Sequence, residues 1–312
     1  MSGRRVSSVV TVLMVLACLG TARTTSAQLN GPNIKGDAGL KSGSQAPPGG
    51  YLVVPLYFYS ADALKDRNGN EFAKGSLDAT VYGVGLNYVT NMKVGGANYG
   101  FLVVLPGANN RIQGGRIDEN PGQGITDMYV QPLGLGWHSK RADTTVGYGL
   151  FVPTGRYKDG ASNNTGLGMW GNELLAGTTV YLDEKKTWHA ATTASLDFFS
   201  KKKDSNVKVG NVLNLEGGLG HDMLQGGLSA GLAYYATYKV SDDQLAPVAN
   251  VLVKGRNRVY GVGPEATLAI AAKKTVYGFV TVRYQWEMGA RVAPEGGAFN
   301  ILAVILLKPI HL

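Results

Sequence analysis

Cysteine and histidine are scarce in this sequence of 312 residues. It holds one cysteine, Cys18, and four histidines, no two of which are neighbours. A structural zinc site needs about four clustered Cys or His ligands, so we expect no metal and no cofactor. Because Cys18 lies within a predicted leader, the mature chain is expected to have no thiol and no disulfide.

The few histidines also limit the possible catalytic chemistry. A serine nucleophile needs a histidine within hydrogen-bond reach. Ser139 adjoins His138, but neighbouring side chains on a strand point to opposite faces. His189 and Ser195 share a face but lie about 20 Å apart along an extended strand, at ~3.3 Å per residue. We therefore predict that the protein is not an enzyme, with an outer-membrane lipid hydrolase as the minor alternative.

A long apolar run occurs only at the N-terminus. The basic pair Arg4-Arg5 precedes apolar residues 6–19, and a small-residue stretch ends at Ala27. This pattern predicts a secretory signal peptide, residues 1–27. A membrane-anchoring helix is the first alternative, although the run is short of the ~20 residues that span a bilayer. The second is a lipoprotein leader cleaved before Cys18. The chain is expected to leave the cytoplasm.

The excess of positive charge is modest. The formal charge is +8, and the predicted leader removes Arg4, Arg5 and Arg23 but no acidic residue, which leaves 8 − 3 = 5. The remaining basic residues are spread over expected loops, apart from a cluster at 201–203. These loops are expected to be solvated or to touch anionic lipid head groups. Nucleic acid is not an expected partner of an exported chain with this distribution.

Glycine, in contrast, is abundant. The chain has 44 glycines, many of which stand singly within alternating segments such as 81–86 and 228–232. Within strands, glycine marks bends, bulges and close approaches, which a closed sheet requires. With no helical membrane span after the leader, the composition favours a β-barrel, whose apolar band is hidden in alternation.

The stretch from Thr275 to Met288 shows that alternation most clearly. A period of two separates its side chains into two faces, as a β-strand does. The stretch is longer than the about 5 to 6 residues of a typical strand, and a tilted strand of roughly 9 to 11 residues crosses a bilayer. We interpret it as one strand of a membrane barrel. Its apolar face holds Val276, Gly278, Val280, Val282, Tyr284, Trp286 and Met288, and its polar face holds Thr281, Arg283, Gln285 and Glu287.

The rest of the chain repeats this pattern. Residues 28–50 have no periodicity and are expected to form a periplasmic tail or a partial plug, and residues 51–312 are expected to form the barrel. Long and short connections alternate between the strands, which predicts short periplasmic turns, long external loops and both termini in the periplasm. The all-β fold expected is a transmembrane antiparallel up-and-down barrel of about twelve strands, at 51–60, 77–90, 97–106, 124–138, 144–154, 172–182, 187–200, 207–220, 226–240, 258–271, 275–288 and 298–308.

Charged and amide side chains within these strands are predicted to face the lumen. A charge on the lipid face near the bilayer midplane costs about 2 to 4 kcal/mol. Two interpretations remain open, a polar pathway for solute and an internal salt-bridge network that fills the barrel. The candidate lumen residues are Asp127, Asp197, Glu216, Glu265, Arg283, Gln285 and Glu287.

Several segments together resemble one family. The first is Pro47-Pro-Gly-Gly-Tyr51, which leads into an aromatic first strand. The second is Gly-Leu-Phe-Val-Pro-Thr-Gly-Arg-Tyr, which begins at Gly149, and the third is Gly-Val-Gly-Pro-Glu, which ends at Glu265. With residues 291–299, these segments are similar to outer-membrane proteins of the meta-pathway phenol degradation type. The resemblance implies an outer-membrane barrel without a cofactor that takes up aromatic and other hydrophobic compounds passively. Such barrels commonly end in an aromatic residue that the insertion machinery reads, whereas this chain ends at Leu312.

These observations predict passive uptake of small hydrophobic or aromatic solutes across a bacterial outer membrane. For such solutes the obstacle is lipopolysaccharide and not water, so we expect a narrow or partly plugged lumen with a lateral exit. The expected partners are the solutes, the outer-membrane lipid and lipopolysaccharide, and the barrel-insertion machinery. The alternative is a barrel that transports nothing and has a structural or adhesive role through its external loops.

Overall fold

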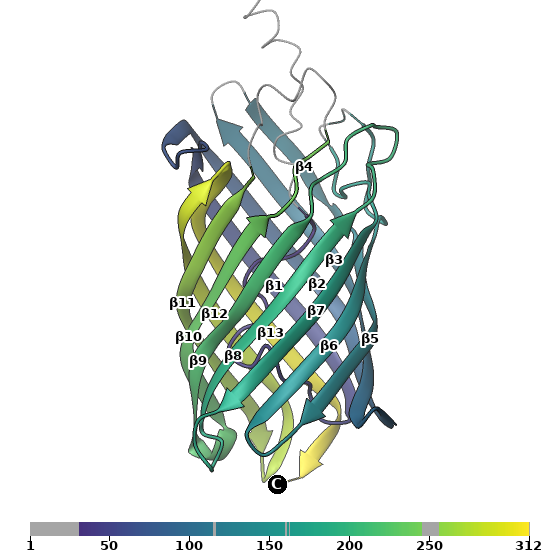
Figure 1. Cartoon of the computed structure of the whole chain (residues 1–312), viewed down its shortest axis with the longest axis vertical. Coiled ribbons are helices and arrows are strands. Elements are labelled where there is room, and N and C mark those ends of the chain that lie inside the picture. Colours follow the sequence, from purple (N-terminus) through teal and green to yellow (C-terminus); the bar gives the residue numbers. More distant parts are fainter. Residues whose placement is uncertain (1–30, 115–116, 160, 162, 245–255, 312) are drawn as a thin grey trace, which may run out of the picture.

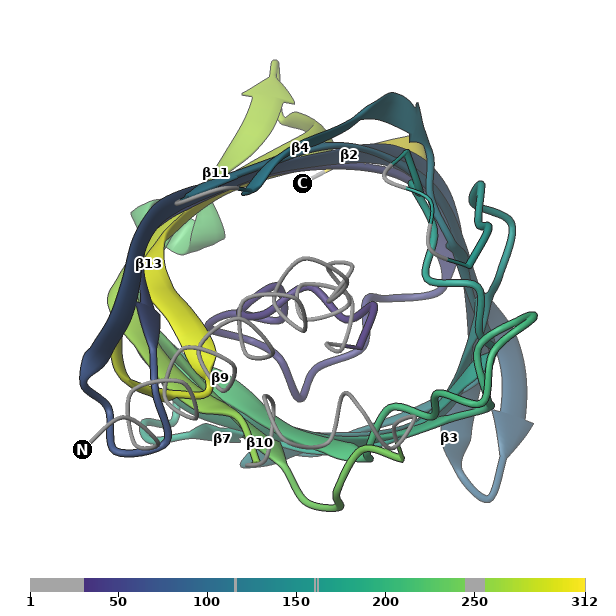
Figure 2. The same cartoon turned by 90° about the horizontal axis from the view of Figure 1, so that it is seen from above.

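The chain forms a closed antiparallel β-barrel (Figures 1 and 2). The computed structural model describes residues 31–114, 117–159, 161, 163–244 and 256–311. Within them, twelve strands form a ring that the pairing of β2 with β3 closes, and β4 is an additional strand paired to β3. The predicted fold class is confirmed. The strands are β1 (Gly49–Lys65), β2 (Glu71–Val94), β3 (Ala97–Gly114), β4 (Ile117–Ile125), β5 (Met128–His138), β6 (Ala142–Val152), β7 (Gly171–Tyr181), β8 (Trp188–Phe199), β9 (Val212–Met223), β10 (Leu228–Lys239), β11 (Arg258–Ala272), β12 (Thr275–Arg291) and β13 (Ala293–His311).

The two ends of the barrel differ in their connections. One end, which we call the turn end, carries the short connections and the C-terminal end of β13 (Figure 1). The other, the loop end, carries the connections 153–170, 200–211 and 240–257. The only helix among the described residues is a single 3-10 turn, Leu224–Gly226, and none is long and apolar enough to cross a membrane.

Three of the expected long loops are instead largely strand. In the predicted connection 107–123, β3 continues to Gly114 and β4 begins at Ile117. The predicted connection 61–76 shrinks to residues 66–70, because β1 and β2 continue beyond the predicted ends. Likewise β12 and β13 meet at a single residue, Val292, which adopts a left-handed φ of 50°. The predicted strand 124–138 is also divided, since β4 ends at Ile125 and β5 begins at Met128. The sequence places strand centres well because apolar alternation marks them, whereas polar hairpin extensions lack that signal.

Side chains on β12 alternate as predicted along most of the strand. Arg283, Gln285 and Glu287 are buried, while Tyr284 and Trp286 between them are 37% and 55% exposed. The prediction is wrong at the start of β12. Its register against β13 shifts between Val276 and Gly278, so that Val276 is buried and Tyr277 is exposed. A β-bulge of this kind exchanges the two faces, and the residue pattern does not reveal it.

The outer surface is apolar at mid-height and aromatic towards its ends. Its mid-height leucines are between 49% and 59% exposed, as expected for lipid-facing side chains. Exposed aromatic residues lie near both ends of the strands, which is where membrane-water interfaces collect Trp and Tyr. The leucines are Leu174, Leu219, Leu232 and Leu268, and the aromatic residues are Trp188 and Tyr277 towards the turn end and Trp170, Tyr284 and Trp286 towards the loop end.

The last strand is apolar on both faces, and its inner face is covered. Leu306 packs with Tyr51 and Val89, and Ala46 of the N-terminal segment packs against this cluster. The inward side of Leu306 therefore contacts β1, β2 and the N-terminal segment. The predicted leader with Cys18 and both chain ends lie outside the described residues.

The outward direction of the leucine side chains leads to a prediction about stability. Leu232 is near the middle of β10 and is 59% exposed. Leu232→Arg should lower the free energy of unfolding by about 2 to 4 kcal/mol, because it places a charge in the hydrocarbon layer. Chemical denaturation of the protein in lipid vesicles measures this change.

A matched control is Leu224→Arg in the turn between β9 and β10, where the leucine is 76% exposed. It should change stability little, since an exposed turn is solvated. Equal losses for the two variants would contradict the assignment of the outer face.

Candidate functional site

The N-terminal segment threads the interior of the barrel. We call residues 31–48 the lumen segment, and Figure 2 shows it inside the ring of strands. Gly31 packs against Phe199 at the loop end, where an added Cβ would lie 2.6 Å from the ring. Ser44 reaches the turn end and donates to Asp143 Oδ2 at 2.9 Å. The segment therefore runs the length of the lumen.

Glu216 on β9 is the first anchor of the lumen segment. Its two carboxylate oxygens accept hydrogen bonds from the backbone N–H groups of Gly36 at 2.8 Å and Ala38 at 3.0 Å. Gly36 has φ +72° and Gly39 has φ +69°, a backbone conformation that favours glycine. The carboxylate thus satisfies backbone donors that have no strand partner of their own.

A buried ion pair forms the second anchor. Arg283 Nε on β12 donates to Glu265 Oε2 on β11 at 2.6 Å, and both side chains are about 5% exposed or less. Glu265 also accepts from the Leu40 N–H, at 3.2 and 3.3 Å, and Arg283 donates to the Gly36 carbonyl. Side chains on two strands are therefore satisfied by the lumen segment as well as by one another.

Glu287 is held by hydroxyls from two other strands. Tyr59 and Tyr235 donate to its two oxygens at 2.6 and 2.7 Å, and Lys35 Nζ of the lumen segment lies 3.2 Å away. Gln285, fully buried on the same face of β12, packs against Gly36, where an added Cβ would collide with its amide. The wall formed by β9 to β12 therefore binds the segment through Glu216, Glu265, Arg283 and Glu287.

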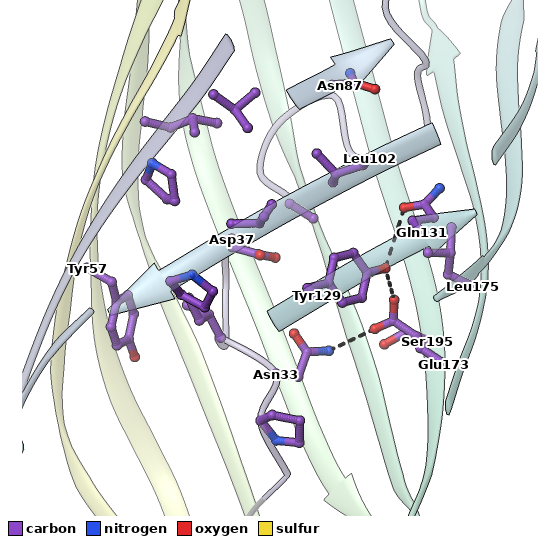
Figure 3. Close-up of a pocket in the computed structure, with 18 of the residues that line it drawn as sticks. Asn33, Asp37, Tyr57, Asn87, Leu102, Tyr129, Gln131, Glu173, Leu175 and Ser195 are labelled. Atoms are coloured by element: carbon purple, nitrogen blue, oxygen red, sulfur yellow. Dashed lines mark hydrogen bonds between the residues drawn. The ribbon is translucent and has the colours of Figure 1, made fainter. Parts of the chain in front are cut away.

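On the opposite side of the lumen segment lies a cavity of about 630 Å³. Its wall is formed largely by β1 to β3 and β5 to β7, and its lining is mainly apolar. Figure 3 shows Tyr57, Leu102, Tyr129 and Leu175 converging on this space. A volume of this size falls within the about 300 to 1,000 Å³ of typical small-molecule sites.

A few polar groups are fixed at one side of the cavity (Figure 3). Tyr129 donates to Glu173 Oε1 at 2.6 Å, and Asn33 of the lumen segment donates to Glu173 Oε2 at 3.2 Å. Asp37 of the lumen segment also lines the cavity.

The seven candidate lumen residues are all buried in the barrel, with exposures of 8% or less. They do not form one site. Glu265, Gln285 and Glu287 lie under the lumen segment, whereas Glu216 and Arg283 touch both the segment and the cavity. The two others are Asp197, which accepts from Asn214 at 3.2 Å, and Asp127, which also lines the cavity.

Asp127 binds a loop at the loop end of the barrel. Its carboxylate accepts from the backbone N–H of Gly155 at 3.1 Å and of Leu167 at 2.8 Å. Gly155 and Gly166 are in contact there, since a Cβ on Gly155 would lie 2.5 Å from Gly166 Cα. The Phe-Val-Pro-Thr-Gly segment, which ends at Gly155, is therefore the point where the loop 153–170 is fastened to the barrel.

Sequence reasoning missed several residues of the cavity. Glu173 follows the same rule that identified the candidates, because it is a charged residue within a predicted strand. Tyr57 and Tyr129 carried no such signal, since tyrosine is also common on the outer face. Asp37 lies in the aperiodic segment 28–50, where no pattern indicates which side chains face a cavity.

His189 has both a serine and an aspartate within reach of its ring. His189 Nε2 lies 3.2 Å from Asp222 Oδ1 and 3.5 Å from Ser229 Oγ. A catalytic triad uses the two ring nitrogens separately, whereas here both partners face the same nitrogen. Lys41 of the lumen segment also binds Asp222, at 2.6 Å. No group of three or more possible metal ligands occurs in the described part of the chain.

These anchors predict how the lumen segment can be released. Glu216→Ala removes two hydrogen bonds to a charged acceptor, each worth about 1.5 to 3 kcal/mol. Trypsin should then cut after Lys35 and Lys41 faster than in the wild type, and ion conductance in planar bilayers should rise.

Glu184→Ala is the control, because the Glu184 side chain is 92% exposed in a turn. Its ion pair with Arg141 is long, at 4.0 Å. The control variant should change neither quantity. Unchanged proteolysis and conductance in Glu216→Ala would show that Glu216 does not hold the segment.

Comparison with known proteins supports a common fold. An outer-membrane channel from Pseudomonas putida F1 has a crystal structure with a TM-score of 0.71 to this chain, at 15% identity, covering 85% of this chain and 97% of the channel. The β-domain of the Bordetella autotransporter BrkA gives a TM-score of 0.47 at 14% identity, covering 83% and 99%. The CymD monoaromatic hydrocarbon channel gives 0.44 at 10% identity, covering 85% and 90%. At 15% identity, the similarity to the Pseudomonas putida F1 channel shows the fold alone.

No curated protein matches the sequence. A family model does, and it spans residues 61–303, from the first strand to the last. The chain belongs to the family described as the putative MetA-pathway of phenol degradation.

Proposed function

We propose that the protein is a passive outer-membrane channel for small, neutral, hydrophobic or aromatic compounds. The observation that carries this proposal is the largely apolar cavity of about 630 Å³ inside a transmembrane barrel. The family to which the chain belongs, whose description refers to phenol degradation, supports the same class of solute. In this proposal the protein contributes a path and no catalytic step.

The path runs between the lumen segment and the wall of β1 to β3 and β5 to β7. On the other side of the segment, Glu216, Glu265 and Arg283 bind its backbone and leave it little freedom. The cavity side of the segment has fewer anchors, and one of them is the hydrogen bond that Asn33 donates to Glu173. A solute can therefore pass with local movements of the segment, and the narrow path excludes bulky polar molecules.

The charges around the cavity favour neutral solutes. Among the described lining residues, Asp37, Asp127, Glu173 and Glu216 are acidic, and Arg283 is the only basic one. Arg283 is already paired with Glu265. An aromatic carboxylate would lose its hydration and meet a surplus of like charge, whereas a phenol loses less hydration and can donate to a carboxylate.

The outer surface fits this setting. Its apolar middle and aromatic ends suit a bilayer, and we assign that bilayer to the bacterial outer membrane, with lipopolysaccharide around the loop end. The barrel-insertion machinery would place it there. Lipopolysaccharide slows hydrophobic solutes, which gives such a channel its use.

The proposal is tested by uptake in a porin-deficient Gram-negative host that expresses the protein. Phenol uptake at neutral pH should rise above that of cells carrying an empty vector, and benzoate uptake should rise much less. If neither solute enters faster while heat-modifiable mobility shows a folded barrel, the channel proposal fails and the structural or adhesive alternative gains support.

A separate variant tests the proposed preference for neutral over negatively charged solutes. Glu173→Gln should raise benzoate uptake roughly tenfold relative to phenol, the effect of about 1.4 kcal/mol of relieved repulsion. The exposed Glu184→Gln is the control and should leave the ratio unchanged. An unchanged ratio in Glu173→Gln would contradict the role of cavity charge.

A further inference from the structure

Two neighbouring residues of the lumen wall have polar side-chain groups without a partner. Tyr57 on β1 and Asn300 on β13 are directly opposite each other in the strand register, and both are buried. Directly opposite residues of an antiparallel pair face the same side of the sheet, with Cα atoms about 4.5 to 5.5 Å apart. Both residues line the cavity of about 630 Å³. Their side chains therefore belong to one place on its surface.

Asn300 differs from the other buried asparagines of the described residues. Asn98, Asn164 and Asn214 each donate the side-chain amide to an oxygen, at 2.9, 2.9 and 3.2 Å. Asn300 is 8% exposed, and its Nδ2 group has no hydrogen-bond partner in the described part of the chain. A buried amide donor costs free energy until a group accepts its hydrogens.

Tyr57 is the corresponding exception among the buried tyrosines. Tyr59 and Tyr235 donate their hydroxyls to Glu287 at 2.6 and 2.7 Å, and the Tyr51 hydroxyl donates to a backbone carbonyl at 2.6 Å. Across the residues that the structure describes, the Tyr57 hydroxyl has no such acceptor. The two exceptions are thus the two residues that face each other on β1 and β13.

The ring of Tyr57 is nevertheless held in place. It lies parallel to the Tyr59 ring, with an interplanar angle of 2° and centroids 6.4 Å apart. Ile34 of the lumen segment and Val81 on β2 pack against the same cluster. Figure 3 shows Tyr57 on the side of the pocket away from Glu173. Its hydroxyl is therefore positioned apart from the paired polar groups around Glu173.

The strand register places the two groups between a charged pair and an apolar wall. Beyond Asn300 the register continues to Arg283, whose guanidinium is already in an ion pair. Beyond Tyr57 it continues to Val81 on β2 and then to Ala108 on β3, and both of these residues line the cavity. An aromatic ring can rest on this apolar side while its substituent reaches the two polar groups.

The chemistry of an amide beside a hydroxyl fits a ring hydroxyl. Each of the two groups can donate and accept hydrogen bonds, and a phenol does both through one oxygen. A hydrocarbon of the same size would cover the two groups without pairing them, which is unfavourable. An aromatic carboxylate would meet the surplus of acidic residues in the lining.

We propose that Asn300 and Tyr57 form a binding site for the hydroxyl group of neutral aromatic solutes, through which the channel selects hydroxylated rings over hydrocarbons of the same size. The inference rests on the proposed channel function and adds the residues that discriminate among its solutes. Because each hydrogen bond in the site replaces one with water, the preference is modest and the solute is released readily.

Uptake of phenol and toluene, which have nearly the same size, tests this site in the porin-deficient host. Both solutes are supplied at a concentration low enough that uptake is proportional to it. Asn300→Leu replaces the amide by an apolar group of similar volume, and Tyr57→Phe removes only the hydroxyl. Each variant should lower the ratio of phenol to toluene uptake about fivefold, the effect of one lost hydrogen bond. Toluene uptake, normalised to the folded barrel by heat-modifiable mobility, should not fall.

Two matched controls alter the same residue types away from the cavity. Asn109→Leu changes an exposed asparagine on β3, and Tyr277→Phe changes a tyrosine on β12 that is 45% exposed. Neither should change the ratio of the two solutes.

The variants of the site and the wild type fail in different ways. An unchanged ratio in Asn300→Leu and Tyr57→Phe, or an equal fall in the uptake of both solutes, would overturn the hydroxyl site while wild-type uptake still supports the channel. If the wild type admits neither phenol nor toluene, the channel proposal itself fails, and the site fails with it.

Discussion

The structure depends on one constraint, that no backbone N–H or C=O group can remain unpaired within hydrocarbon. A sheet meets this condition only when it closes, which here requires the pairing of β2 with β3. Closure fixes which side chains face lipid and which face the lumen, so the outer leucines and the inner carboxylates follow from the same alternation. The interior created in this way must then be filled or left as a path.

Both outcomes occur in this barrel, on opposite walls. The wall of β9 to β12 supplies Glu216, Glu265 and Arg283, which bind the backbone of the lumen segment. The wall of β1 to β3 and β5 to β7 leaves a cavity. The two interpretations left open by the sequence, an internal polar network and a path, therefore describe different halves of one lumen. The network positions the segment, and the position of the segment gives the cavity its width.

Irregularities in the sheet determine where the barrel departs from a uniform cylinder. The bulge at Val276 changes the facing of side chains at the start of β12, and the register of β5 shifts near Pro132, in the wall of the cavity. Asp127 fastens the loop 153–170 above the same cavity. Each feature uses few residues, yet together they shape the lumen.

The sequence by itself determined the barrel, its twelve ring strands and the inward direction of Glu216, Glu265, Arg283 and Glu287, because a period of two and the cost of charge in lipid act locally. It did not determine β4, the extended hairpins or the bulges, since these depend on pairing between distant segments. Only the tertiary structure placed Glu265 and Glu287 under the lumen segment and Tyr129 and Glu173 beside the cavity. The path of residues 31–48 is set by long-range hydrogen bonds to strands up to 252 positions away. The sequence of this aperiodic stretch does not indicate which strand residues those partners are.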